Sequence, residues 1–66
     1  MLVFAETGLG SCIKDYPNLD DARRGILKEV GSYNGISTLR WATKDDIGWV
    51  AGMGGHVPKG KLKGER

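Results

Sequence analysis

The sequence has few of the residues on which metal binding and redox chemistry depend. Its 66 residues include one cysteine, Cys12, and one histidine, His56. A single cysteine cannot form a disulfide within the chain, and one cysteine with one histidine is too few for a structural zinc site. Small domains without disulfides are typical of reducing compartments. We therefore expect a cytoplasmic protein that binds no metal.

Long apolar runs are also missing. No stretch reaches the roughly 18 consecutive apolar residues that a transmembrane helix needs, so we expect no membrane contact. The first residues, MLVFAETG, have no basic segment before the apolar run and reach an acid at Glu6. A secretory signal peptide has the opposite charge pattern, and this start supports a cytoplasmic location.

Two glycine-containing stretches begin like nucleotide-binding motifs and then depart from them. The residues 8–10 start the fingerprint G-x-G-x-x-G, but Ile13 stands where the third glycine would be. The residues 55–61 follow G-x-x-x-x-G-K, but Leu62 replaces the Ser or Thr that would reach Mg²⁺. We interpret both as chance similarities, and no cofactor is expected.

The residues for catalysis are sparse as well. Catalysis needs a nucleophile, a base and an orienting group within reach of one another, and no serine lies near His56 in the sequence. Cys12 is interpreted as a half-buried, inert thiol. The hairpin register could bring the acids Glu6 and Asp15 near each other as an acid–base pair, but solvated edge charges are the better explanation. We expect that the protein is not an enzyme.

The patterns that are present predict a hairpin at the start of the chain. The short apolar run 1–6 indicates a strand, and residues 11–16 would be the strand that returns beside it. Between them, residues 8–9 suit a two-residue turn of type II′, with glycine at its first position. This register pairs Phe4 with Ile13 and directs them to one face of the sheet.

A helix over 19–33 follows, with Asn18 as its N-cap. Its apolar positions recur at spacings of 3 or 4 and would form one face: Leu19, Ala22, Ile26, Val30 and Tyr33. The β-branched and aromatic run 36–42 indicates a third strand. Thr43 is then the N-cap of a short helix over 44–53.

The predicted fold class is therefore α+β, in the order ββαβα, with a small, mainly antiparallel three-stranded sheet. The favoured strand order is 2-1-3, with the long helix on one face; such a sheet can leave its other face open to water. The alternative puts the third strand beside the second through a right-handed crossover. Residues 1–56 are predicted to form one compact domain, and 57–66 a flexible basic tail.

Charge is distributed unevenly along the chain. Residues 57–66 carry four basic side chains against one acid, a net charge of +3. Residues 1–56 carry six against seven, a net charge of −1. Such a tail can contact phosphates in a salt-dependent manner, dock on an acidic protein groove, or only keep the chain soluble.

These observations favour a small, non-enzymatic intracellular protein that occupies the surface of a protein partner. Phage and mobile-element proteins that inhibit or modulate a host machine are frequently of this size and kind. The expected partner contacts are Trp49, Met53, His56, Lys59, Lys61, Lys63 and Arg66.

Two alternatives remain open at this point. One is a nucleic-acid-binding module, which would follow a phosphate backbone with Arg23, Arg24, Arg40, Lys59, Lys61 and Lys63. The other is a structural subunit of a virion or a larger assembly, whose neighbours would supply the burial that a chain of this size lacks.

Overall fold

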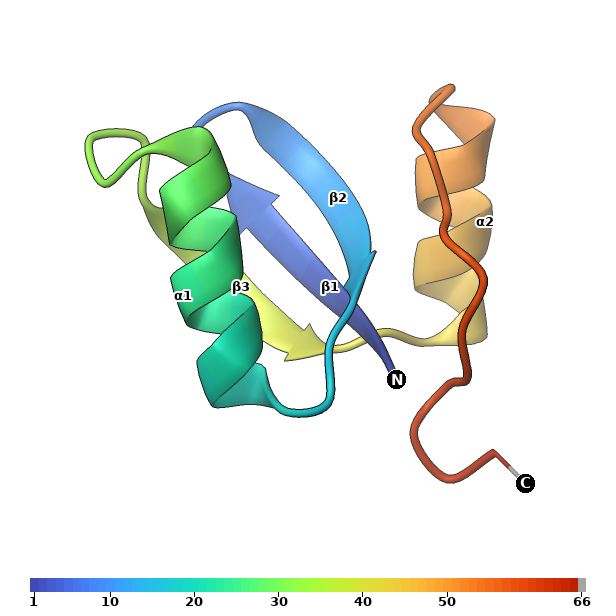
Figure 1. Ribbon diagram of the computed structural model, residues 1–66. Helices are drawn as coiled ribbons and strands as arrows, with labels where there is room; N and C mark the ends of the chain where they lie inside the picture. Colours follow the sequence, from blue (N-terminus) through green and yellow to red (C-terminus); the bar gives the residue numbers. More distant parts are fainter. Residues whose placement is uncertain (66) are drawn as a thin grey trace.

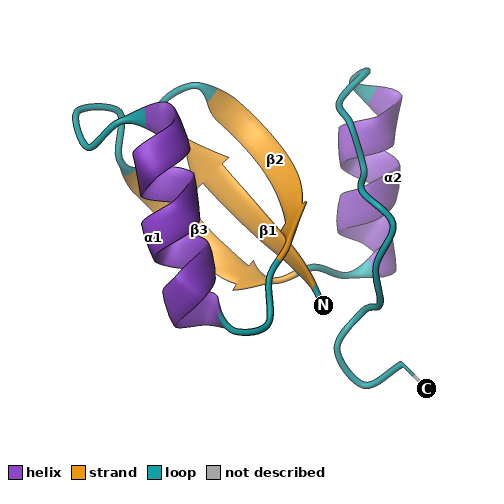
Figure 2. Ribbon diagram, in the orientation of Figure 1, coloured by secondary structure: helices purple, strands orange, loops and turns teal. Residues whose placement is uncertain are grey.

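The computed structural model describes residues 1–65, which form a three-stranded antiparallel sheet and two helices (Figures 1 and 2). The elements are β1 (Leu2–Thr7), β2 (Gly10–Asp15), α1 (Leu19–Val30), β3 (Ile36–Trp41) and α2 (Lys44–Gly52). The strand order is β2-β1-β3, and both pairings are antiparallel. The predicted order of elements and of strands is confirmed, and the alternative with β3 beside β2 is wrong.

The β1–β2 hairpin has the predicted register, with Phe4 opposite Ile13 and a two-residue connection. The Thr7 hydroxyl holds the turn, because it accepts from the Leu9 amide at 3.1 Å and donates to the Gly10 carbonyl at 3.0 Å. The positive φ of the turn, 120°, belongs to Gly10 rather than to Gly8. The prediction of a type II′ turn is therefore wrong, since that turn needs a positive φ at its first central residue.

Helix α1 begins as predicted and ends earlier. The Asn18 side chain accepts from the amide of Asp21 at 2.8 Å, which is the N-cap bond. Gly31 ends the helix with φ 84° and donates its amide to the Leu27 carbonyl, a conformation that glycine adopts without strain. Tyr33 therefore lies in the following loop and is fully exposed, so its assignment to the apolar face is wrong.

Both faces of the sheet are covered, which corrects the expectation of one open face. On one face, Val3 and Ala5 pack against Ala22 and Ile26 of α1. On the other, the α2 residue Val50 joins a cluster of strand and loop residues: Leu2, Phe4, Ile13 and Ala42, with Ile47, Val57 and Leu62 at its border. Figure 1 shows α1 and α2 on different sides of the sheet.

The segment 57–65 has no helix or strand and runs beside α2 (Figure 1). Its carbonyl at Lys61 accepts from the Leu2 amide at 2.7 Å, and Val57 and Leu62 border the cluster on the α2 face. The Lys63 ammonium lies 5.7 Å from the centre of the Trp41 ring. The segment predicted as a tail thus contacts the domain along its length. Neither of the helices in residues 1–65 is long and apolar enough to cross a membrane.

Candidate partner-binding surface

Two large apolar side chains, one in α2 and one at its C-cap, point away from the core. Trp49 is 59% exposed and Met53 is 67% exposed. They are four residues apart, so they lie on one side of the helix axis. Val50, between them in sequence, is buried against the sheet. The helix therefore presents apolar surface both to the core and to solvent.

A third exposed apolar side chain, Leu9, lies at the tip of the hairpin. It is 69% exposed, and it lines a groove of about 190 Å³ with Val50 and Met53. The sequence interpretation missed Leu9. Its signal was present, because a leucine in a two-residue turn between glycines has no neighbouring layer to cover it. We call Leu9, Trp49 and Met53 together the hairpin-end surface.

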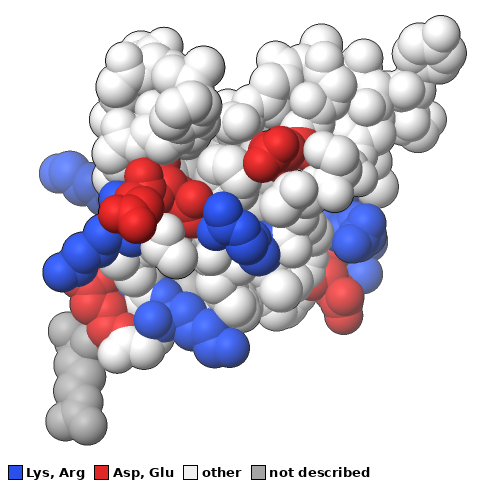
Figure 3. Space-filling view, turned by 180° about the vertical axis from the view of Figure 1, so that it is seen from behind, with Lys and Arg blue, Asp and Glu red and all other residues white. Residues whose placement is uncertain are grey.

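Charged side chains are few at the top of the face shown in Figure 3. Its uppermost part is white, one acidic patch lies just below it, and most Lys, Arg, Asp and Glu side chains gather lower down. Large apolar side chains without charged neighbours are characteristic of the centre of protein–protein interfaces. The three side chains of the surface can therefore bury apolar area on docking.

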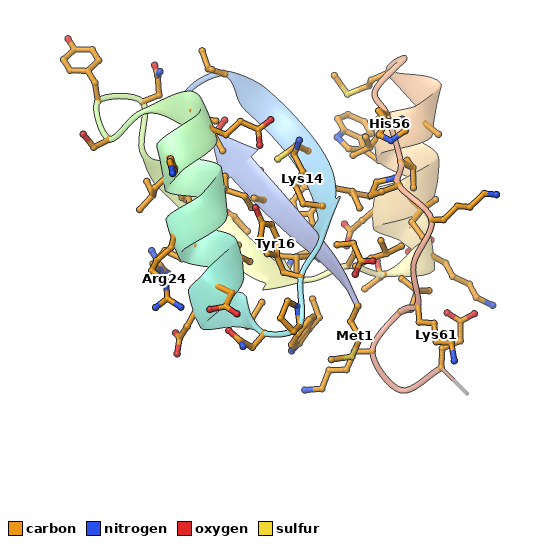
Figure 4. All side chains as sticks on the ribbon, in the orientation of Figure 1. Met1, Lys14, Tyr16, Arg24, His56 and Lys61 are labelled. Carbon is orange, nitrogen blue, oxygen red and sulfur yellow. The ribbon has the colours of Figure 1, made fainter. Side chains whose placement is uncertain are left out.

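The predicted basic contacts are spread along the chain after α2. His56 is near the upper part of α2 in Figure 4, whereas Lys61 lies lower down, near Met1. Lys59, Lys61 and Lys63 are all exposed. The predicted partner residues therefore do not form one contiguous contact with the hairpin-end surface. Arg66 lies outside the described residues.

Two of the three arginines proposed for nucleic-acid binding are already paired. Arg40 donates to both carboxylate oxygens of Asp46, at 2.5 and 2.8 Å, and stacks 4.6 Å from the centre of the Phe4 ring. Arg24 forms an ion pair with Asp21. Arg23 is exposed on α1. Because the pairs neutralise part of this set, its net charge toward a phosphate backbone is reduced.

A second groove, of about 340 Å³, lies between β2 and the last turns of α1. Cys12, Ile26 and Val30 contribute its apolar lining. Lys14 and Glu29 also line it and are joined by an ion pair of 2.9 Å. This hydrogen bond to Glu29 raises the pKa of Lys14. The groove thus combines an apolar lining with one fixed pair of charges.

The structure gives the surroundings of the groups considered for catalysis, the Cys12 thiol and the acids Glu6 and Asp15. Burial raises the pKa of the Cys12 thiol, with a smaller opposing effect of Lys14, so the nucleophilic thiolate is disfavoured at neutral pH. Glu6 lies opposite Ser11 and Asp15 opposite Leu2, so the register separates the two acids that were considered as a pair. Within residues 1–65, no group of three or more His, Cys, Asp and Glu side chains is placed to hold a metal ion.

Comparison of the chain with protein-family models, with curated proteins and with solved structures finds no match. The chemistry of the surface itself therefore carries the functional argument. Its strongest feature is the set of exposed apolar side chains Leu9, Trp49 and Met53, of which Leu9 and Met53 line one groove.

Proposed function

We propose that the protein binds another protein through the hairpin-end surface and acts by occupying its partner's surface rather than by catalysing a reaction. One observation carries the proposal: Leu9, Trp49 and Met53 are each more than half exposed. Exposed apolar area stabilises a complex by about 25 cal/mol for each Å² removed from water. Tryptophan and methionine are also enriched at protein interfaces.

The basic segment has a different role in this proposal. Lys59, Lys61 and Lys63 are exposed and belong to the segment 57–65, which runs beside α2. Charges outside the centre of an interface chiefly change the rate of association, and their effect weakens with salt. The proposed partner therefore has an apolar contact region and an acidic surface beside it.

The test is affinity capture with the full chain, in nuclease-treated extract of the cells that express it. The variant Trp49→Ala/Met53→Ala is expected to recover at least tenfold less partner than the original chain. Tyr33→Ala is the matched control, because Tyr33 is a fully exposed aromatic residue on the loop after α1. This control is expected to recover as much partner as the original chain.

Two results would contradict the proposal. Equal recovery by the double variant and the original chain would show that the hairpin-end surface is not the contact. Recovery that disappears after nuclease treatment, with binding to generic DNA or RNA that weakens steeply from about 50 to 200 mM salt, would favour the nucleic-acid alternative.

A further inference from the structure

Strand β2 forms one edge of the sheet, and part of that edge is open. The Tyr16 amide donates to the Met1 carbonyl at 3.0 Å, and the Met1 amino group donates to the Tyr16 carbonyl at 3.2 Å. Antiparallel ladders alternate between bonded and non-bonded pairs. The same register therefore turns the backbone groups of Ser11, Ile13 and Asp15 away from β1.

The Ser11 end of this edge is accessible, whereas Ile13 in its middle is not. Ile13 is 1% exposed, and Gly60 of the C-terminal segment lies against Asp15, since a Cβ on Gly60 would be 3.1 Å from the Asp15 carboxylate. Ser11 is exposed. Among residues 1–65, its amide and carbonyl form no hydrogen bond outside the sheet ladder. A free donor and a free acceptor thus stand side by side at the hairpin end.

The two grooves lie on opposite faces of the sheet beside this point. The groove of about 190 Å³ is on the α2 face, and the groove of about 340 Å³ is on the α1 face. Leu9, Gly10 and Ser11 line both of them. A strand placed against Ser11 would direct successive side chains to alternate faces, and each face offers it a groove.

We propose that an extended segment of the partner protein adds to the sheet as a short fourth strand, paired with the backbone of Ser11. This inference rests on the proposed function and specifies how the partner is recognised. The residue opposite Ser11 would place an apolar side chain beside Val50 and Met53. Its neighbours would enter the groove against α1, where a larger side chain with a polar end can reach Lys14 and Glu29.

Hydrogen bonding to the Ser11 backbone favours an extended partner segment over a helix. The amide and carbonyl of Ser11 need partners from another backbone, and an extended chain has such groups free along one side. A helix uses its own backbone groups for internal hydrogen bonds. Its side chains also do not alternate between two opposite faces, so they would not enter the two grooves in turn. The C-terminal segment of this chain is not the occupant, because its Lys61 carbonyl is bonded to Leu2 at the far end of the sheet.

The test removes one backbone donor without removing a bond of the sheet. Peptides of 12 residues are selected from a displayed random library on the immobilised full chain, and one selected peptide is synthesised. Ser11→Pro deletes the outward amide, a position at which proline is tolerated in an edge strand. Ser11→Ala is the matched control, because it keeps the amide. We expect Ser11→Pro to weaken binding at least tenfold, and Ser11→Ala less than threefold.

A second measurement guards against a folding defect in Ser11→Pro, which circular dichroism would detect. The selected peptide is N-methylated at single positions, and methylation of one central amide is expected to weaken binding to the unchanged protein at least tenfold. The selected peptides are also expected to share apolar residues at alternate positions, as a strand between two grooves requires.

Results that contradict strand addition can be distinguished from a failure of the proposed function. One such result is a set of selected peptides with apolar residues at helical spacing, whose binding is unchanged by Ser11→Pro and by N-methylation but weakened by Trp49→Ala. This result would overturn strand addition and leave the hairpin-end surface as a contact. Selection of no peptide above the background would also overturn strand addition. Capture of the protein partner would then decide the proposed function separately.

Discussion

At the scale of single residues, Asp46 connects more of the structure than any other charged side chain in residues 1–65. It is the only buried polar or charged residue among them, at 8% exposure. Its carboxylate accepts from the Thr43 amide at 2.8 Å and the Thr43 hydroxyl at 3.0 Å, as well as from Arg40. Because Arg40 is on β3 and Thr43 precedes α2, one side chain fixes the end of a strand to the start of a helix.

These bonds predict a specific pH dependence. The hydrogen bonds from Arg40, with those from Thr43, lower the pKa of Asp46 against the cost of its burial. The unfolded chain therefore binds this proton more readily, and the carboxylate stabilises the fold above its ordinary pKa near 4. That contribution is lost as the pH falls below about 4. We expect Asp46→Asn to lower the free energy of unfolding at pH 7 by about 1–3 kcal/mol.

Chemical denaturation at a series of pH values from 7 to 2 measures this effect. The stability of Asp46→Asn should fall less steeply below pH 4 than that of the original chain. Asp45→Asn is the control, since Asp45 is exposed and adjacent. It should change stability by less than about 0.5 kcal/mol. Parallel pH curves for the original chain and Asp46→Asn would show that Asp46 does not contribute as its bonds indicate.

The sequence predicted the capping box of Thr43 and Asp46 but not the ion pair between Asp46 and Arg40. Thr43 and Asp46 are three residues apart before an apolar run, which is a local pattern, and the capping box is confirmed. Arg40 was interpreted as a nucleic-acid contact because its charge was visible and its partner was not. The pairing with Asp46 depends on the angle between β3 and α2, which no local spacing encodes.

At the scale of elements, glycines in the two helices have different surroundings. A Cβ on Gly25 of α1 would overlap the Tyr16 side chain, with its Cζ only 2.6 Å away. Around Gly48 of α2 there is open space within 4 Å. Gly25 therefore allows the close approach of Tyr16 to α1, whereas Gly48 costs α2 intrinsic helix stability without such a reason.

Replacing each glycine with alanine should move stability in opposite directions. Gly48→Ala is expected to raise the free energy of unfolding by about 0.5–1 kcal/mol, through helix propensity alone. Gly25→Ala is expected to lower it by about 1–3 kcal/mol, because the overlap forces Tyr16 to move. Urea denaturation of the two variants and of Gly25→Ala/Tyr16→Ala measures the difference. Stabilisation by both alanines would show that Tyr16 does not constrain α1.

The bounds of the helices and strands show which signals in the sequence were sufficient to predict them. The hairpin register followed from the two-residue connection and the alternation of apolar residues. The end of α1 did not follow from periodicity, because Tyr33 continues the apolar spacing beyond the helix. The helix instead ends at Gly31, whose φ is 84°. Backbone conformation at one glycine thus outweighed the side-chain pattern after it.

At the scale of the whole molecule, the sheet needs cover on both faces. The cover on the second face was not predicted, because its two parts are inconspicuous in sequence. Helix α2 contains two glycines, and the residues 57–65 are rich in lysine. Within that segment, Val57 and Leu62 are the apolar residues that border the core. Their spacing of five residues matches neither a helix nor a strand, so no periodic signal identified them.

This arrangement predicts that residues 57–66 contribute to stability. A domain of this size buries a smaller fraction of its unfolded surface than a larger domain does, and it is therefore marginally stable. Deleting 57–66 removes Val57 and Leu62 from the cluster and takes the Lys61 carbonyl from the Leu2 amide. We expect the shortened chain to lose about 2 kcal/mol or more of its free energy of unfolding, measured by thermal and urea denaturation.

The control for this deletion separates charge from packing. Lys59→Gln/Lys61→Gln removes two charges of the segment but keeps both apolar residues and the Lys61 backbone carbonyl. Because both lysines are exposed, this variant should unfold within about 0.5 kcal/mol of the original chain. If the shortened chain instead unfolds at the same midpoint as the original, residues 1–56 form the complete domain, and 57–66 are a dispensable tail. A loss in the shortened chain alone would mean that the basic segment is part of the fold, held by Val57 and Leu62.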